Sequence, residues 1–283
     1  MIKVRNLSYT YPKSSESTLK NLNFEINEGE IFGFLGPSGA GKSTTQKILY
    51  KILHNFEGEI LVKNKPLQNW GKEYFEQIGV GFELPNHYLK LTAKENLQLF
   101  ASFYKNEKLL DFNELIDIVG LTDSFNKRVE EFSKGMKMRL NFIRAIMHNP
   151  DLIFLDEPTS GLDPINAQKI KRHIVKLKNQ GKTIFVTTHD MATADELCDR
   201  VSFIVEGEIR LTEKPSVLKE EHGKHSVKVE LKNEKTAEFP LEGLGKNPQF
   251  LEFIQTGELA RINSQEATLE EVFIKVTGAN LSE

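Results

Sequence analysis

Three short apolar runs stand out along the chain and predict strands that are covered on both faces. They occupy residues 31–35 (IFGFL), 151–155 (DLIFL) and 183–187 (TIFVT), and each lacks the alternation of a half-exposed strand. The first run leads directly into a glycine-rich turn. Continuous apolar strands of this kind are typical of the centre of a parallel sheet.

Helices are predicted between these strands. One is expected over about residues 42–53, directly after the glycine-rich turn, and another over residues 164–179. In the second, Ile170, Ile174 and Leu177 recur at helical spacing. Because strand and helix alternate, the sequence predicts an α/β fold whose parallel strands are joined by right-handed crossovers.

The pattern becomes mainly helical between residues 84 and 149. We interpret this stretch as a helical subdomain inserted into an α/β domain that spans residues 1–220. The helices predicted within it cover residues 92–104, 111–119 and 133–147.

A further change of pattern begins near residue 226. Val227, Val229 and Leu231 alternate with polar residues, as in a half-buried strand. An amphipathic helix is predicted over residues 268–276. We therefore expect a small α+β extension over residues 221–283.

Composition limits the classes of function. Apolar residues make up 39% of the 283 residues and charged residues 27%, so the chain can bury a core. The formal net charge of −3 provides no overall positive field, so no nucleic-acid partner is expected. The single cysteine, Cys198, excludes an intrachain disulfide and favours a reducing compartment. No run reaches the ~18 apolar residues of a membrane span.

The glycine-rich turn has the spacing GxxxxGK[ST] of a phosphate-binding loop, and it lies between a predicted strand and helix as that motif requires. Its glycines let successive backbone N–H groups converge on phosphate oxygens, and the following helix directs its positive dipole end at the same anion. Lys42 is expected to contact the β and γ phosphates, and Ser43 to bind Mg²⁺. The predicted cradle consists of Gly36, Pro37, Ser38, Gly39, Ala40, Gly41, Lys42, Ser43 and Thr44.

Two acidic residues, Asp156 and Glu157, follow the apolar run at residues 151–155. The carboxyl end of a parallel strand lies at the edge of the sheet where ligands bind, beside the phosphate cradle. There Asp156 can hold Mg²⁺ through water, and Glu157 can polarise an attacking water molecule. The alternative is an acidic pair that only ends a strand in a solvated turn.

Further segments follow in a characteristic order. They are Phe132-Ser133-Lys134-Gly135-Met136, residues 152–158 (LIFLDEP), Ser160-Gly161-Leu162-Asp163 and His189. With the phosphate loop, this order resembles the signature loop, Walker B segment, D-loop and switch histidine of the ATP-binding subunits of ABC transporters, over roughly residues 1–215. The resemblance implies a P-loop NTPase (RecA-like) fold, with a parallel sheet core, an antiparallel β subdomain and the helical subdomain.

The resemblance also implies roles within one subunit. In this family the glutamate that matches Glu157 is the general base, and the histidine that matches His189 contacts the γ-phosphate and orients water. The family carries an aromatic residue that stacks on adenine, and its position matches Tyr11. Tyr9 alternates with Tyr11 along the chain, so either ring could instead be an ordinary strand aromatic.

Other roles imply a second subunit. The family's signature loop contacts ATP that is held by the opposite subunit, and the resemblance assigns this contact to Ser133 and Gly135. Asp163 of the D-loop joins the nucleotide site. Lys134 replaces the first glycine of the usual LSGGQ signature, which puts the conformation of this loop in question.

Glu83 departs from the family pattern. Residues 91–97 (LTAKENL) fix the register, and counting back places Glu83 where the family carries glutamine. Gln77 precedes the predicted strand at residues 78–82, so it lies at the wrong end of the sheet. Glu83 can still offer an oxygen to Mg²⁺ and take part in catalysis, but its charge predicts slow turnover or strong dependence on pH and metal. A tolerated change, with water filling the gap, is the alternative.

The resemblance finally implies partners. The family acts through a separate transmembrane permease, contacted near residues 83–92, and through head-to-tail dimers of two copies or of one copy and a related subunit. We therefore expect a cytoplasmic ATPase held at the cytoplasmic face of the cell membrane. Residues 266–278 look like the C-terminal end of the exporter-type group, which favours export. A soluble P-loop ATPase, a P-loop kinase and a weakly catalytic nucleotide-binding module are the alternatives.

Overall fold

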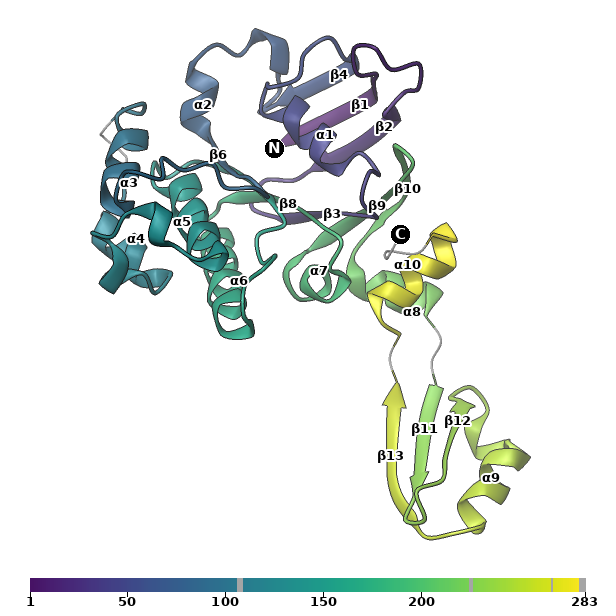
Figure 1. Cartoon of the computed structure of the whole chain (residues 1–283). Coiled ribbons are helices and arrows are strands. Elements are labelled where there is room, and N and C mark those ends of the chain that lie inside the picture. Colours follow the sequence, from purple (N-terminus) through teal and green to yellow (C-terminus); the bar gives the residue numbers. More distant parts are fainter. Residues whose placement is uncertain (106–108, 224–225, 266, 280–283) are drawn as a thin grey trace. The chain divides into compact units, whose positions relative to one another are not determined.

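A computed structural model describes residues 1–105, 109–223, 226–265 and 267–279 of the chain (Figure 1). It forms two compact units, which are unit 1 (Met1–Thr212) and unit 2 (Glu213–Ala279). Within the expected extension, residues 224–225, 266 and 280–283 lie outside the described residues. Residue 266 is also the first of the segment that resembles exporter-type C-terminal ends.

The centre of unit 1 is a six-stranded sheet with the order β10-β9-β3-β8-β7-β6. The neighbours from β9 to β6 pair in parallel. Every residue of β3, β7 and β8 is buried, which confirms the three apolar runs as central strands covered on both faces. The strands are β3 (Ile31–Leu35), β6 (Ile78–Gly81), β7 (Leu152–Asp156), β8 (Thr183–Thr188), β9 (Arg200–Val205) and β10 (Glu208–Glu213).

An antiparallel sheet with the order β2-β1-β4-β5 packs over this one. Phe24 of the antiparallel sheet stacks on Phe32 and Phe185 of the parallel sheet, with ring centroids 5.9 and 6.2 Å apart. One hydrophobic core therefore serves both sheets. The strands are β1 (Ile2–Tyr9), β2 (Leu19–Ile26), β4 (Glu57–Val62) and β5 (Lys65–Pro66).

Helix α1 (Lys42–Leu49) begins where it was predicted but ends four residues early, and the predicted end at residue 53 is wrong. Lys51 adopts a left-handed conformation with φ of 61°. The amide of Ile52 then donates to the carbonyl of Lys47 at 2.8 Å, which closes the helix in a Schellman-type turn. Helix α6 (Pro164–Asn179) has the predicted bounds. The remaining short helices beside the sheet are α2 (Glu73–Gln77) and α7 (Met191–Leu197).

The helical subdomain gathers beyond β6 at one end of the sheet (Figure 1). Helix α5 contacts the segment that follows β6 at three points along one face. The Asn141 amide donates to the carbonyl of Phe82 at 2.8 Å, Arg144 donates to the carbonyl of Asn86 at 2.6 Å, and His87 Nε2 lies 3.0 Å from the carbonyl of Lys137. The helices are α3 (Ala93–Ala101), α4 (Phe112–Ile118) and α5 (Lys134–Ile146).

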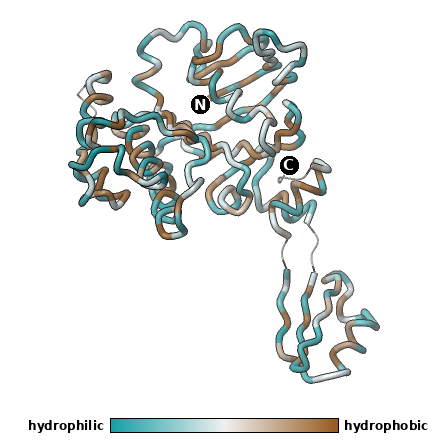
Figure 2. Tube along the Cα trace, viewed as in Figure 1, coloured by the Kyte–Doolittle hydropathy of each residue, from teal (hydrophilic) through white to brown (hydrophobic). Residues whose placement is uncertain are grey.

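Unit 2 contains an antiparallel sheet with the order β12-β11-β13, and hydrophobic and hydrophilic positions alternate along β11 (Figure 2). Its core includes Val227, Val229, Phe239 and Phe250. Among the described residues, no helix combines the length and the apolar character that a membrane crossing requires. The elements are α8 (Pro215–His222), β11 (Ser226–Leu231), β12 (Thr236–Pro240), α9 (Pro248–Gln255), β13 (Leu259–Gln265) and α10 (Leu269–Thr277).

His87 makes the stability of this fold depend on pH. Burial, and then the nearby Arg144, lower the pKa of His87 to about 4, whereas histidine in an unfolded chain has a pKa near 6.5. Between these values the unfolded chain binds a proton that the folded chain does not bind, so stability is lost as the pH falls. Urea unfolding from pH 6.5 to 4 should show this loss.

Replacing His87 should flatten that dependence. As the pH is lowered, the free energy of unfolding decreases in both proteins, and we expect a smaller slope for His87→Gln. The difference in slope should be up to about 1.4 kcal/mol per pH unit. Burial also lowers the pKa of His173 to about 4. The pH dependence of the free energy of unfolding of His173→Gln can therefore be compared with that of His87→Gln. Parallel stability curves for His87→Gln and the unchanged chain would contradict the prediction.

Candidate active site

The turn between β3 and α1 has a backbone that only glycine accommodates at its two critical points. A Cβ on Gly36 would lie 2.0 Å from the carbonyl oxygen of Ile204, so nothing larger fits there. Gly41 precedes α1 with φ of 106°, a left-handed conformation that other residues rarely adopt. Helix α1 therefore starts at Lys42 with its free N–H groups at the turn, which is the geometry that binds phosphate.

A cavity of about 340 Å³ opens in front of this turn. It brings together the phosphate loop and predicted site residues from three other segments: Glu83 after β6, Asp156 and Glu157 at the end of β7, and His189 after β8. These strands are parallel, so their carboxyl ends share one edge of the sheet. The lining residues are Ser38, Gly39, Gly41, Lys42, Ser43, Thr44, Glu83, Asp156, Glu157 and His189.

Lys42 is the buried cation of this cavity. Its ammonium group donates to the carbonyls of Gly36 at 2.7 Å and Pro37 at 2.9 Å, within the phosphate loop itself. Burial lowers the pKa of Lys42, while the carboxylates of Glu157, Asp156 and Glu83 act in the opposite direction.

The carboxylates outnumber the cation. Glu83, Asp156 and Glu157 face one lysine in the lining, so an anionic triphosphate needs additional positive charge to bind there. No cluster of three or more His, Cys, Asp or Glu side chains suited to a metal ion occurs in the described part of the chain. The hydroxyl of Ser43 and the carboxylate of Asp156 nevertheless fit Mg²⁺, which binds through few protein oxygens and completes its shell with phosphates and water.

Glu157 has a strained backbone and a fully engaged side chain. Its φ is 49°, in the left-handed region that residues other than glycine seldom adopt. Its Oε1 accepts from the His189 amide at 2.9 Å and lies 2.6 Å from the ring nitrogen Nδ1 of His189. Its Oε2 accepts from the Thr188 hydroxyl at 2.9 Å. The end of β8 therefore fixes the direction in which this carboxylate points.

Sequence reasoning missed two residues of the site. Thr187 and Thr188 donate to Asp156 and Glu157 respectively. The available signal was the pair of hydroxyl residues directly before His189, at the end of an otherwise apolar strand. Only the order of the strands shows that this pair lies beside the carboxylates.

Glu83 and Gln77 lie at opposite ends of β6. Glu83 lines the cavity. Gln77 ends α2 before the strand begins, and its side chain accepts from Lys63 at 2.9 Å. Of these two residues, Glu83 is the one at the cavity, and its match to the family's glutamine stays a prediction.

Tyr11 lies beside the start of α1. Its hydroxyl is 3.1 Å from the hydroxyl of Thr44, a lining residue of the cavity. The ring packs edge-to-face against Tyr9, which is buried, whereas Tyr11 is half-buried. Of the two tyrosines, Tyr11 therefore has the ring open to a ligand.

Ser133, Gly135 and Asp163 do not line the cavity described above. Ser133 is exposed and caps α5 by accepting from the amide of Met136 at 3.2 Å. Asp163 is exposed and caps α6, and hydrogen bonds from Asn166 lower its pKa. A single chain thus presents these residues to its surroundings rather than to its own phosphate loop.

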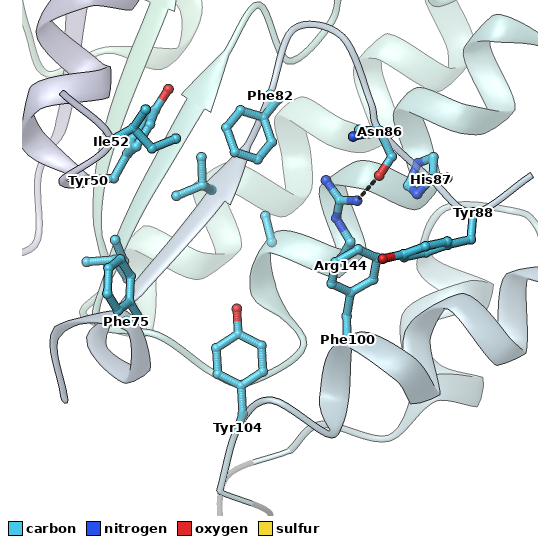
Figure 3. Close-up of a pocket in the computed structure, with 13 residues that line it drawn as sticks. Tyr50, Ile52, Phe75, Phe82, Asn86, His87, Tyr88, Phe100, Tyr104 and Arg144 are labelled. Carbon is cyan, nitrogen blue, oxygen red and sulfur yellow. Dashed lines mark hydrogen bonds between the residues drawn. The ribbon is translucent and has the colours of Figure 1, made fainter. Parts of the chain in front are cut away.

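A second cavity, of about 480 Å³, lies between β6 and the helical subdomain (Figure 3). Aromatic rings surround it, and the guanidinium of Arg144 lies 4.5 Å from the centroid of Phe100. Tyr88 and Phe75 are 55% and 46% exposed, so part of this apolar lining is open to solvent. The aromatic lining residues are Tyr50, Phe75, Phe82, Tyr88, Phe100 and Tyr104.

Comparison with known proteins gives similarity along the whole chain. The ABC transporter family matches residues 19–160, and the fluoroquinolone efflux ABC transporter C-terminal domain matches residues 225–266. The chain is 50% identical to the fluoroquinolones export ATP-binding protein of Mycobacterium tuberculosis, over 100% of this chain and 95% of the relative. It is 38% identical to the bacitracin transport ATP-binding protein of Bacillus licheniformis, over 74% and 68% of the two chains.

Solved structures agree with these relatives. A dimeric ATP-binding cassette in a post-hydrolysis state, bound to ADP and Pi, superposes with a TM-score of 0.68 at 31% identity, covering 76% of this chain and 98% of that chain. An ATP-binding subunit of an ABC transporter superposes with a TM-score of 0.71 at 28% identity, covering 78% and 93%. The fold expected from the sequence is confirmed. The chain belongs to the ABC transporter family, as an ATP-hydrolysing subunit of its exporter-type group.

Proposed function

We propose that this chain hydrolyses ATP in the 340 Å³ cavity and that the reaction powers a separate permease for export. The observation that carries the proposal is the placement of Lys42 and Ser43 opposite Asp156 and Glu157 around one cavity. A kinase would have to bind the acceptor of the phosphoryl group next to Glu157. Hydrolysis requires only a water molecule at that position. The ATP-binding roles of the relatives support the same reaction.

The binding roles follow from chemistry. Tyr11 stacks on the adenine, the backbone N–H groups of the phosphate loop hold the phosphates, and Lys42 leaves the loop carbonyls to contact the β and γ phosphates. Ser43 and Asp156, with Glu83 nearby, would hold Mg²⁺. When bound, Mg²⁺ neutralises charge on the phosphates.

The catalytic roles belong to the end of β7 and β8. Glu157 takes a proton from the attacking water as the general base. His189, whose side chain is 56% exposed and touches Glu157, contacts the γ-phosphate and helps to orient that water. General-base catalysis of this kind contributes ~10²- to 10⁴-fold to the rate.

A head-to-tail dimer completes each site. Ser133 and Gly135 at the start of α5, with Asp163, are exposed or partly exposed and lie outside the cavity of their own chain, which suits contact with ATP held by another subunit. ATP then joins two subunits, and its hydrolysis weakens their association. The dimeric cassette with ADP and Pi, which this chain resembles, supports dimerisation.

The aromatic cavity is the place where we expect the permease. It is lined in part by residues of the 83–92 segment, and an exposed apolar lining is typical of an interaction site. Contact there would hold the ATPase at the cytoplasmic face of the membrane. We further propose that residues 1–220 form the ATPase domain and residues 221–283 an extension, with α8, which crosses this boundary, grouped with unit 2. Fluoroquinolones are the first substrates to test, because one relative is a fluoroquinolones export ATP-binding protein.

Replacing the proposed base should separate binding from hydrolysis. For Glu157→Gln, we expect phosphate release to fall by at least about 100-fold while ATP binding persists. Light scattering should show an ATP-dependent dimer, because the variant does not hydrolyse the ATP that holds the two subunits together. A monomer at saturating Mg-ATP would contradict the composite site, and undiminished phosphate release would contradict the role of Glu157.

Replacing Glu83 tests the excess negative charge. For Glu83→Gln, we expect kcat to rise by about tenfold, equivalent to ~1.4 kcal/mol of activation free energy, or the pH dependence of turnover to weaken. Steady-state phosphate release across pH measures both. An unchanged rate and an unchanged pH profile would favour the tolerated change, with no electrostatic role for Glu83.

Truncating the exposed aromatic side chain tests the permease contact. For Tyr88→Ala, we expect basal ATPase activity to persist and co-purification with the permease to weaken by about tenfold, as for an interface anchor. Ile165→Ala is the matched control, because Ile165 is an exposed apolar residue of α6, away from the aromatic cavity. Equal co-purification of both variants with the permease would place the contact elsewhere.

A further inference from the structure

Two threonines of β8 lie directly beside the two carboxylates at the end of β7. Thr187 is the register partner of Asp156 in the parallel pair, and its hydroxyl lies 2.5 Å from Asp156 Oδ1. Thr188 is the next residue, and its hydroxyl lies 2.9 Å from Glu157 Oε2. Both threonines are fully buried. Each carboxylate therefore receives one hydroxyl from the neighbouring strand.

The direction of the first hydroxyl is set by Gln46 of α1. The Gln46 amide nitrogen Nε2 lies 3.3 Å from the carbonyl of Leu155 and 3.1 Å from Thr187 Oγ1. A carbonyl oxygen only accepts, so the atom facing Leu155 must be the NH₂ group, and its second hydrogen is then directed at Thr187. A hydroxyl has one hydrogen, and Thr187 Oγ1 lies 2.5 Å from Asp156 Oδ1 but 3.5 Å from the carbonyl of Leu155, so Thr187 accepts from Gln46 and donates mainly to Asp156.

The second hydroxyl is directed in the same way by the backbone. The amide of Asp190 donates to Thr188 Oγ1 at 3.0 Å. The single hydrogen of Thr188 is left for Glu157 Oε2. In both pairs a fixed N–H group occupies the acceptor side of the threonine, and the proton points at a carboxylate.

Gln46 has an energetic cost that packing alone does not explain. It is fully buried, and its Oε1 has no hydrogen-bond partner among the described residues. A buried acceptor without a partner destabilises the fold, whereas an apolar side chain of similar size would fill the same space without that penalty. What glutamine adds is the N–H group that orients Thr187.

We propose that Gln46, Thr187 and Thr188 are positioning residues that aim the two carboxylates of the ATPase site. Gln46 and Thr187 orient Asp156 toward the side of the cavity where Ser43 lies, and Thr188 orients Glu157 toward the attacking water. The inference depends on the proposed roles of Asp156 and Glu157. The hydrogen-bond network thus has a metal-side branch, in which Gln46 and Thr187 hold Asp156, and a water-side branch, in which Thr188 holds Glu157. Mutations in the two branches should affect different measurements.

The water-side branch is tested with Thr188→Val, Thr188→Ser and a control. Mutating a residue that orients a functional group typically lowers activity or metal affinity by ~10- to 100-fold. Thr188→Val should lower kcat by that factor at an unchanged KM for ATP, and Thr188→Ser should restore kcat. Thr183→Val is the matched control, because Thr183 is fully buried at the other end of β8 and its hydroxyl accepts from Gly29. It should keep the kcat of the unchanged chain.

The metal-side branch is tested by binding, without turnover. A fluorescent ATP analogue is titrated with and without Mg²⁺ into the unchanged chain, Gln46→Leu, Thr187→Val and Thr187→Ser. We expect Gln46→Leu and Thr187→Val to reduce the Mg²⁺-dependent gain in affinity by ~10-fold or more, with Mg²⁺-free binding unchanged, and Thr187→Ser to restore the gain. Circular dichroism confirms that each variant is folded.

The outcomes separate this inference from the proposed function. Hydrolysis by the unchanged chain that Glu157→Gln abolishes supports the ATPase site whatever the threonine variants do. With that result in hand, wild-type kcat in Thr188→Val, or equal loss in Thr188→Val and Thr183→Val, would overturn the water-side branch. Unchanged Mg²⁺-dependent binding in Gln46→Leu and Thr187→Val would overturn the metal-side branch. An unchanged chain that releases no phosphate contradicts the proposed function instead.

Discussion

The parallel pairing of β3, β8 and β7 is the constraint on which the site depends. Because the three strands run in the same direction, the phosphate loop, His189 and the two carboxylates leave the sheet at one edge. The strands are buried throughout, so the hydrophobic core that fixes their register also fixes the distances between reacting groups. The hydrophobic core thus determines where the phosphate loop, His189 and the two carboxylates lie relative to one another.

Electrostatics and backbone strain are concentrated at the same edge. One buried lysine faces three carboxylates, and Glu157 keeps a left-handed backbone that costs ~1–3 kcal/mol in a residue other than glycine. The surrounding hydrogen bonds hold this conformation, since the Glu157 amide donates to the carbonyl of Thr187 and its carboxylate accepts from Thr188 and His189. Hydrogen bonds within the protein therefore hold the carboxylate of Glu157 in place.

Local sequence signals predicted what local interactions determine. Helix α6 has its expected bounds because Asp163 caps it, Pro164 occupies the first turn and the apolar residues repeat at helical spacing. The apolar pattern predicts too long an α1, because apolar residues continue past Lys51, whose left-handed backbone ends the helix. Helix α7 has only seven residues, too few to show a period. The contact between Thr187 and Asp156 depends on strand order, which no local pattern contains.

The attachment of α5 to the segment after β6 has a mechanical consequence. Asn141, Arg144 and the carbonyl of Lys137 bind this segment, and Ser133 lies at the start of the same helix. From Arg144 to Ser133 the helix spans roughly 16 Å at 1.5 Å per residue. Because α5 is one continuous helix, a displacement of Asn86 would also act on the end of α5 where Ser133 lies.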